Sequence, residues 1–436
     1  MLNYIWLGLV LAAVLLGGAT GQLQEVTTAA FDSCKTAVMT IALPLAGVMA
    51  LWLGIMRLAE KSGLMHALAK LLRPLMTRIF PDVPAGHPAM GSMIMNMAAN
   101  MLGLANAATP LGLRAMQDLE KLNPRPGTAT NAMCTFLALN TSSVQLIPAS
   151  AVAILAAAGS VQPTAIIGTA LVATLCSTIA GLVSVKTLEK LSFYRLPPIT
   201  APDEAAKEKE EESQPAAVTA EAPASLGLGP RLLLGVFGAF FLWLLWRTAS
   251  AGYDGDRGVF ASYVEAISVL AIPFLLSFFP LYAALRRVPV YEEFVEGAKE
   301  GIQVALRIIP FLVAILVAIG MFRGAGGIDL LSRGLDPIFQ AIGFPTELLP
   351  MAIMRPLSGS GTMGIFSELV TTHGPDSLLA RMAGTIMGST ETTFYVIAVY
   401  FGSVAIRRTR HAVPAGLIAD LTGITASVII CRLVFG

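Results

Sequence analysis

Charged residues are scarce in this sequence. Asp, Glu, Lys and Arg make up 13% of the 436 residues, against about 25% in a typical soluble domain. The 29 basic and 28 acidic residues nearly cancel, so no basic surface is available to hold phosphate backbones. This composition excludes an ordinary soluble enzyme, a disordered chain and a nucleic-acid-binding protein.

Motifs for catalysis and for metal binding are also missing. The four cysteines are far apart and form no CxxC pair, which favours a packing role over a disulfide framework or a metal site. The four histidines are scattered, and neither an HExxH motif nor a phosphate-binding P-loop is present. We therefore expect no enzymatic activity, no metal cofactor and no ATP-driven step in this chain.

Long uncharged stretches are what the sequence does contain. Positions 1–24, 36–56 and 266–285 carry no charge, and 126–185 form sixty consecutive uncharged positions. A helix needs about 20 residues to cross a bilayer. The pattern predicts an all-α, multi-pass membrane protein with the lipid bilayer as a partner. No Lys or Arg precedes the first apolar segment, so we expect a retained helix rather than a signal peptide.

One stretch near the middle has the composition of a disordered linker. Residues 201–225 are rich in Glu, Lys and Pro and offer little apolar surface to bury. We interpret 196–228 as an acidic cytoplasmic linker that joins two fused halves, 1–195 and 229–436.

The two halves repeat each other weakly. The first five pairs of matching residues keep an offset of 262–266, which falls to about 250 farther along because of an insertion near 114–125. The matching pairs are Pro44 with Pro310, Gly63 with Gly327, Pro74 with Pro337, Phe80-Pro81 with Phe344-Pro345, Pro88 with Pro350, Asn140–Ser142 with Ser389–Glu391, and Pro163 with Pro414. We expect two related repeats, at about 36–185 and 308–434.

Basic residues follow the Pro44 helix but precede the Pro310 helix. Loops rich in Lys and Arg stay in the cytoplasm, so the two helices should point in opposite directions and the repeats should be inverted. The resulting topology has nine crossings, two re-entrant hairpins near 84–113 and 346–372, and a cytoplasmic N-terminus with the C-terminus outside. The basic, amphipathic segment 62–80 is expected to lie on the membrane surface or to pack against other helices.

Polar clusters interrupt apolar surroundings at matching places in both repeats. Pro356 and the Ser-Gly-Ser-Gly sequence after it cannot continue a helix comfortably, and interrupted membrane segments typically form transporter binding sites. The candidate substrate-binding residues are Asn96, Asn100, Asn140, Thr141, Ser142, Gln145, Arg355, Ser358, Gly359, Ser360, Thr362, Ser389, Thr390, Thr392 and Thr393. An alternative for the three asparagines is that they cap half-helices.

Two acidic residues lie within predicted crossings. A carboxylate at the centre of a membrane helix costs about 2.5–3.5 kcal/mol on insertion scales, so Glu391 and Asp420 should be paired, protonated or bound to a cation. We expect them to bind a coupling proton or sodium ion. The alternative for Glu391 is a structural role, as a partner of Arg355 or of backbone left open by the second hairpin. For Asp420 a structural role is the favoured alternative.

Three motifs resemble known families. The segment 96–110, NMAANMLGLANAATP, resembles spore maturation protein A, whereas RPLSGSG at 355–361 and GSTETTF at 388–394 resemble spore maturation protein B. The resemblance covers nearly everything except the linker and implies a natural fusion of the two. It also implies membership of the nucleoside-recognition, or gate, group, which includes concentrative nucleoside transporters and the membrane part of ferrous-iron transporter B. The sequence motifs of the nucleoside transporters themselves are absent, so their substrate is not implied.

Together these features predict an inner-membrane secondary transporter or permease for a small polar solute, either anionic or nucleoside-like. Two hairpin tips and two broken helices would enclose its site, and we expect a homo-oligomer. The rival interpretation is a non-transporting scaffold or signalling protein that recruits partners through the acidic linker.

Overall fold

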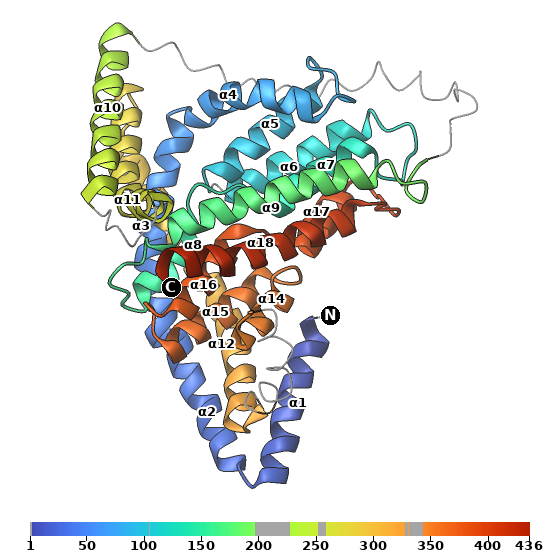
Figure 1. Cartoon of the computed structure of the whole chain (residues 1–436), viewed down its shortest axis with the longest axis vertical. Coiled ribbons are helices and arrows are strands. Elements are labelled where there is room, and N and C mark those ends of the chain that lie inside the picture. The colour runs from blue at the N-terminus through green and yellow to red at the C-terminus, as the bar shows by residue number, and fades with distance from the viewer. Residues whose placement is uncertain (1, 104, 197–226, 252–258, 328–329, 331–342) are drawn as a thin grey trace.

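The structure is a computed structural model that describes the whole chain except residues 1, 104, 197–226, 252–258, 328–329 and 331–342. Its described part is built of helices (Figure 1). The first half contains α1 (Leu2–Thr20), α2 (Leu23–Lys35), the π-helical segment η1 (Thr36–Ala42), α3 (Leu43–Lys61), α4 (Leu64–Ile79), α5 (Pro88–Met101), α6 (Ala105–Glu120), α7 (Asn131–Ser142), α8 (Ala149–Ala157) and α9 (Ile166–Leu188). The second half contains α10 (Leu228–Ala251), α11 (Val259–Leu285), α12 (Val290–Gly324), the 3-10 helix η3 (Thr346–Leu348), α14 (Leu349–Met354), α15 (Gly359–His373), α16 (Leu378–Ser389), α17 (Thr393–Ser403) and α18 (Ala412–Phe435).

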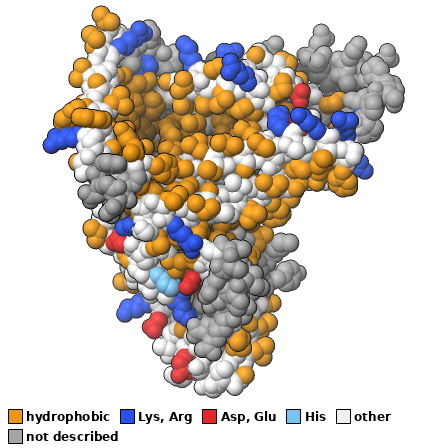
Figure 2. All heavy atoms as spheres, viewed as in Figure 1, with side chains coloured by type: hydrophobic (Ala, Val, Ile, Leu, Met, Phe, Trp, Pro, Cys, Tyr) orange, Lys and Arg blue, Asp and Glu red, His pale blue; other side chains and the backbone are white. Residues whose placement is uncertain are grey.

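Six of the described helices are long and apolar enough to cross a membrane, in agreement with the predicted class. They are Leu23–Lys61, Ile166–Leu188, Leu228–Ala251, Val259–Leu285, Val290–Gly324 and Ala412–Phe435. On the face in Figure 2, hydrophobic side chains cover a broad area, and Lys and Arg side chains line its upper edge. The acidic linker predicted at 196–228 lies almost wholly outside the described residues.

The first long helix differs from the prediction. The uncharged stretch 36–56 predicts a crossing that begins near residue 36, but α2, η1 and α3 form one continuous helix over Leu23–Lys61. Pro44 has no amide hydrogen to donate, and the wider π turns of η1 end just before it. Local π turns of this kind re-satisfy the backbone groups that a proline frees in a membrane helix, so the helix continues through Pro44.

Helix α12 packs antiparallel along this long helix. Glycines place the two backbones in close contact: Gly297 and Gly301 lie against the α3 backbone, and Gly320 and Gly324 lie against α2. Small residues are the usual means by which membrane helices approach closely. The two helices therefore form an antiparallel pair, which we call the central pair. Pro44 and Pro310 occupy matching positions in the repeats, so the two helices are equivalent elements of the two halves.

Both predicted hairpins are present as helical hairpins. The first consists of α5 and α6, which pack against each other around Gly103. The second consists of α14 and α15, and the chain turns between them at 355–358. The side chain of Ser358 accepts a hydrogen bond from the amide of Gly361 and so begins α15. Pro356 and the two serines therefore end one helix and begin the next, as the sequence predicts.

Helices of each half pack against helices of the other half in the same pattern. Helix α9 packs against α18, α7 packs against α18, and α16 packs against α9. The second arm of each hairpin contacts the other half too, because α6 meets α17 and α15 meets α8. This reciprocity is the contact pattern expected of two related repeats facing each other.

Loops at the two ends of this assembly are also joined in pairs. At one end, the amide of Arg407 donates to the carbonyl of Gly127 at 2.9 Å, and the amide of Ala129 donates to that of Arg408 at 3.0 Å. At the other end, Ser160 Oγ donates to Asp376 Oδ1 at 2.6 Å.

Helices α4, α10 and α11 lie at the periphery (Figure 1). Helix α4 confirms the predicted amphipathic segment: Ala69 and Met76 are buried, whereas Leu71 and Leu75 are exposed. It packs against α5 and α3, which supports the packing alternative for one of its faces. Helix α10 packs on α11 through phenylalanine contacts.

Candidate solute-binding site

Two helices break at matching places in the two halves. Helix α7 ends at Ser142, Ser143 takes a left-handed conformation with φ 32°, and α8 resumes only after Pro148. Helix α16 ends at Ser389, and extended backbone at Thr390 separates it from α17. A residue other than glycine with positive φ is uncommon, and proline cannot continue the hydrogen-bond ladder. Both breaks leave backbone groups free to bind other partners.

The two breaks cross each other. The amide of Glu391 donates to the carbonyl of Thr141 at 2.6 Å, and Gln145 Nε2 donates to Glu391 Oε1 at 3.0 Å. Pro148 lies against Gly388, where a β-carbon would be only 2.6 Å from the proline ring. The polar clusters predicted near 140–145 and 389–393 therefore meet.

The tip of each hairpin covers the break in its own half. The amide of Leu146 donates to the carbonyl of Met101 at 3.1 Å, at the end of α5. In the second half, the amide of Phe394 donates to the carbonyl of Pro356 at 3.0 Å. The same contact thus occurs twice, and it brings all four predicted polar segments to one place.

An asparagine network ties the first hairpin to both broken helices. Asn100 Nδ2 donates to Asn140 Oδ1 at 2.9 Å. The hydroxyl of Tyr400, on α17, accepts a hydrogen bond from Asn96 and donates one to Asn140, both at 3.3 Å. None of these asparagines caps a helix; the described N-caps of α5 and α7 are His87 and Thr130. The capping alternative is therefore wrong for these residues.

Tyr400 is a site residue that the sequence analysis missed. It lies in the apolar run 394–401, where an aromatic side chain is expected to belong to the hydrophobic core. A buried tyrosine usually finds a partner for its hydroxyl, and this requirement was the available signal.

The three predicted charged residues do not form an ion pair with one another. Arg355 is buried, its Nη2 donates to the carbonyl of Met387 at 3.0 Å, and no described carboxylate lies within 4 Å of it. Asp420 Oδ2 accepts a hydrogen bond of 2.6 Å from Thr393. The alternative of a direct Glu391–Arg355 salt bridge is therefore wrong, although Glu391 and Asp420 are close enough to act electrostatically on Arg355.

Several buried polar atoms around the crossing have no hydrogen-bond partner among the described residues. Buried polar groups are nearly always hydrogen-bonded, so each exception calls for an explanation. Such atoms at the two breaks and on the flanking elements are Thr141 Oγ1, Ser143 Oγ, Thr390 Oγ1, Arg355 Nε and Asp420 Oδ1. They include both donors and acceptors, as a site for a polar solute requires.

The remaining predicted residues have mostly local contacts. Ser142 Oγ and Ser389 Oγ donate to carbonyls of their own helices, and Thr362 Oγ1 donates to the carbonyl of Ser358. Ser360 Oγ lies 3.4 Å from Ser358 Oγ. Thr392 faces Gly359, whose missing side chain allows the second hairpin to approach the break.

A cavity of about 210 Å³ opens at the crossing between α3, α8 and α12. Gln145 and Glu391 line it, as does Gly103 at the first hairpin tip. Charged side chains farther out are Arg57, Glu60 and Glu300. Glu391 is thus reached from a space that also borders the central pair of helices.

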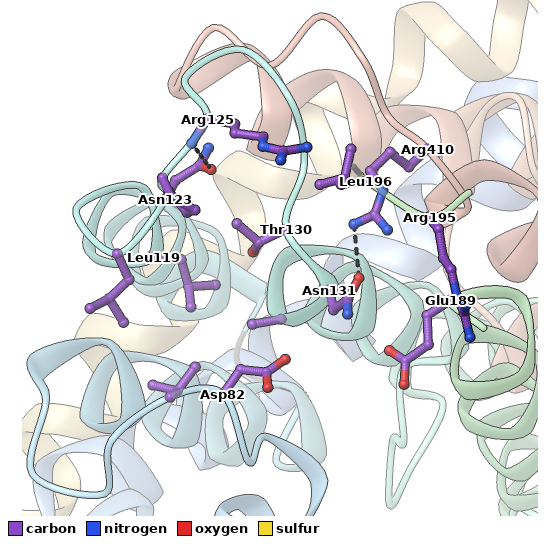
Figure 3. A pocket seen from close by; sticks show the side chains of 14 residues that line it. Asp82, Leu119, Asn123, Arg125, Thr130, Asn131, Glu189, Arg195, Leu196 and Arg410 are labelled. Atoms are coloured by element: carbon purple, nitrogen blue, oxygen red, sulfur yellow. Dashed lines mark hydrogen bonds between the residues drawn. The ribbon is translucent and has the colours of Figure 1, made fainter. Parts of the chain in front are cut away.

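A larger cavity, of about 580 Å³, lies at the ends of α6, α7 and α9 (Figure 3). Arg410 is fixed there, because its Nη1 donates to Asn131 Oδ1 at 2.8 Å and its Nη2 donates to the carbonyl of Tyr194 at 2.7 Å. Helix ends and loops form its described walls, and none of the predicted site residues is among them. We therefore place the candidate site at the crossing breaks.

A family model described as "Gate: Nucleoside recognition" matches residues 42–158 and 305–407, about half of the chain. The chain belongs to this Gate family. Each matched range contains one hairpin and one broken helix. With its six long apolar helices, this Gate protein is a multi-pass membrane protein.

Two relatives are both from Bacillus subtilis. Spore maturation protein B is 47% identical over 173 residues, which are 40% of this chain and 97% of the relative. Spore maturation protein A is 41% identical over 195 residues, which are 45% of this chain and 97% of the relative. The predicted resemblance to both proteins is confirmed, and it is consistent with a fusion of the two.

One solved structure covers nearly the whole chain. It is the YdaH transporter of Alcanivorax borkumensis, with 15% sequence identity and a TM-score of 0.40 over 99% of this chain and 97% of that one. A similarity at this level does not by itself establish a shared fold or activity.

Proposed function

We propose that this Gate protein is a secondary transporter or permease for a small polar solute. The observation that carries the proposal is the crossing of the two breaks. Two hairpin tips cover it, and buried polar atoms without a partner in the described part of the chain surround it. Irregular backbone within a membrane is tolerated where it lines a cavity, and paired broken helices are the usual form of a transporter site.

The charges around the site favour a neutral polar solute, with nucleosides as the first class to test. Glu60, Glu300 and Glu391 line the cavity together with Arg57, so an anion would meet net negative charge on its way in. Arg355 and the hydroxyl group of Thr141, which has no partner among the described residues, offer donors as well as an acceptor. The Gate family's description as nucleoside recognition agrees with this choice.

In this proposal Glu391 binds the coupling proton or sodium ion. Its Oε1 accepts from Gln145 while its side chain borders the cavity, so it can exchange a cation with the aqueous side. Asp420 and Thr393 support the same region from α18 and α17. Movement of the two inverted repeats about this point would expose the solute to either face in turn.

The proposed location is the bacterial inner membrane, with the loops rich in Lys and Arg in the cytoplasm. The end of α9 and the Arg407–Arg410 loop lie together in the structure, which agrees with one cytoplasmic face for both. Reporter fusions after Ser192 and after Gly436 should therefore report opposite faces. Two fusions reporting the same face would contradict this topology.

The proposal is tested by uptake into proteoliposomes. We expect uptake of a labelled nucleoside by the wild type to respond to an imposed pH or sodium gradient. The Glu391→Gln variant should lose that response, while Glu296→Gln, on the exposed side of α12, should keep it. Uptake by Glu391→Gln at the wild-type rate across pH would refute the coupling role.

A further inference from the structure

Two arginines occupy equivalent positions in the two repeats. Arg57 lies thirteen residues after Pro44, and Arg323 lies thirteen residues after Pro310. Since α3 and α12 are antiparallel, these arginines lie toward opposite ends of the central pair. In Figure 1 the C-terminal end of α3 lies near α4, and the C-terminal end of α12 lies near the turn between α1 and α2.

Each arginine borders a cavity. The Arg57 cavity is the space of about 210 Å³ that reaches Gln145 and Glu391. The Arg323 cavity, of about 300 Å³, lies between α2, α12 and α15 and is bordered by Glu368 and by hydroxyl groups such as those of Ser33 and Thr371. Two walls of each cavity come from the central pair, but the third wall differs.

The two arginines also form ion pairs with different helices. Arg57 Nε is 2.7 Å from Glu293 and its Nη1 is 2.6 Å from Glu300, so it ties α3 to α12 only. Arg323 pairs with Glu368, which lies on α15, the second arm of the second hairpin. The side chain of Glu368 is 10% exposed and that of Arg323 is 41% exposed, so the carboxylate is held inside the protein while the arginine still borders water.

The first hairpin has no comparable tie. The first acid of α6 is Asp118, and it bonds Ser92 and Lys121 within the same region of the chain. Among the described residues no acid of α5 or α6 pairs with Arg57. The first hairpin borders the Arg57 cavity through its tip, at Gly103.

We propose that these cavities are the two access routes to one site, and that the Arg323–Glu368 pair closes the route from its face while the Arg57 cavity stays open to Glu391. The role assigned to these routes rests on the proposed transport function, but the labelling experiment that tests them does not require transport. Opening the closed face requires the second hairpin to leave α12, which breaks the ion pair. Loss of the pair should therefore shift the population toward the state open on the Arg323 face.

The test is sided labelling of single cysteines with a membrane-impermeant maleimide. In protein whose four native cysteines are replaced by serine, Ser150→Cys reports on the Arg57 cavity and Ser360→Cys reports on the second hairpin tip. We expect rapid labelling of the first from the Arg57 face and slow labelling of the second from the Arg323 face. Adding Glu368→Gln should speed the second reaction about tenfold, which corresponds to losing roughly 1.4 kcal/mol of closed-state stability.

Two control proteins test whether faster labelling comes from loss of the Arg323–Glu368 pair itself. Arg57→Gln, the equivalent change in the other repeat, should leave labelling of Ser360→Cys from the Arg323 face unchanged. The charge swap of Arg323→Glu with Glu368→Arg should restore slow labelling and would show that the protein remains folded. Unchanged labelling in Glu368→Gln, or equal acceleration by Arg57→Gln, would overturn the proposal. Because labelling needs no solute, these outcomes do not depend on whether transport is found.

Discussion

At the scale of single residues, Tyr400 holds the site together. Its hydroxyl joins Asn96 of the first hairpin to Asn140 of a broken helix, and both asparagines are buried. In Tyr400→Phe, Asn96 keeps its hydrogen bond to the carbonyl of Ala108 and Asn140 keeps the one from Asn100. The variant should therefore lower the free energy of unfolding by about 0.5–1.5 kcal/mol, the net contribution of the lost hydrogen bonding.

Tyr395→Phe is the matched control for this variant. Tyr395 lies on the same helix but its side chain is exposed, so stability should not change. Denaturation followed by tryptophan fluorescence checks both variants. Equal stability of Tyr400→Phe and the wild type would show that the network does not hold the hairpin.

Asp376 gives a pH dependence outside the membrane. Burial raises its pKa, but the hydrogen bonds from Ser160 and Val161 outweigh burial, and the pKa falls below the ordinary value of 3.8. A carboxyl group with a lowered folded-state pKa stabilises the fold above its unfolded pKa, and this stability is lost as the pH falls through the folded pKa.

Thermal unfolding between about pH 5 and pH 3 measures this effect. The wild type should lose stability more steeply over this range than Asp376→Asn. Identical pH profiles would exclude Asp376 as a stabilising link between the loops before α9 and before α16.

At the scale of helices, the sequence predicted where the chain breaks but not how the breaks meet. Pro356 and the glycines that follow it mark the hairpin turn at 355–358, because proline lacks an amide hydrogen and glycine is a poor helix former. The crossing of Thr141 with Glu391 joins residues far apart in the chain, and no local propensity encodes such a contact. The start of the first long helix was predicted wrongly, because the helix begins at Leu23 rather than near residue 36.

Helix α18 supports the second break through a glycine. A β-carbon at Gly423 would be 2.6 Å from Thr390 Cγ2, so Gly423→Ala should displace Thr390 and weaken solute binding tenfold or more, by roughly 1.4 kcal/mol. Gly402→Ala is the control, because nothing lies within 4 Å of its β-carbon position. Equal ligand affinity in the two variants, measured by titration, would separate α18 from the site.

At the scale of the whole molecule, the reciprocal contacts organise the protein. Each half supplies a hairpin, a broken helix and a long helix, and the long helices α9 and α18 pack against the broken helix of the other half. The weak sequence repeat predicted the order of these parts. It could not predict Tyr400 or the ion pairs of Arg57 and Arg323, because these depend on which helices become neighbours.

The central claim is that the crossing breaks bind a polar solute. The most direct test is thermal unfolding of the purified wild type, Glu391→Gln and Glu296→Gln with nucleosides, nucleobases, amino acids, dicarboxylates and metal ions. The account predicts that a nucleoside stabilises the wild type and Glu296→Gln, by about 2.7 kcal/mol at a hundredfold excess over its Kd, and stabilises Glu391→Gln much less. Equal stabilisation of all three proteins, or stabilisation by dicarboxylates alone, would contradict it.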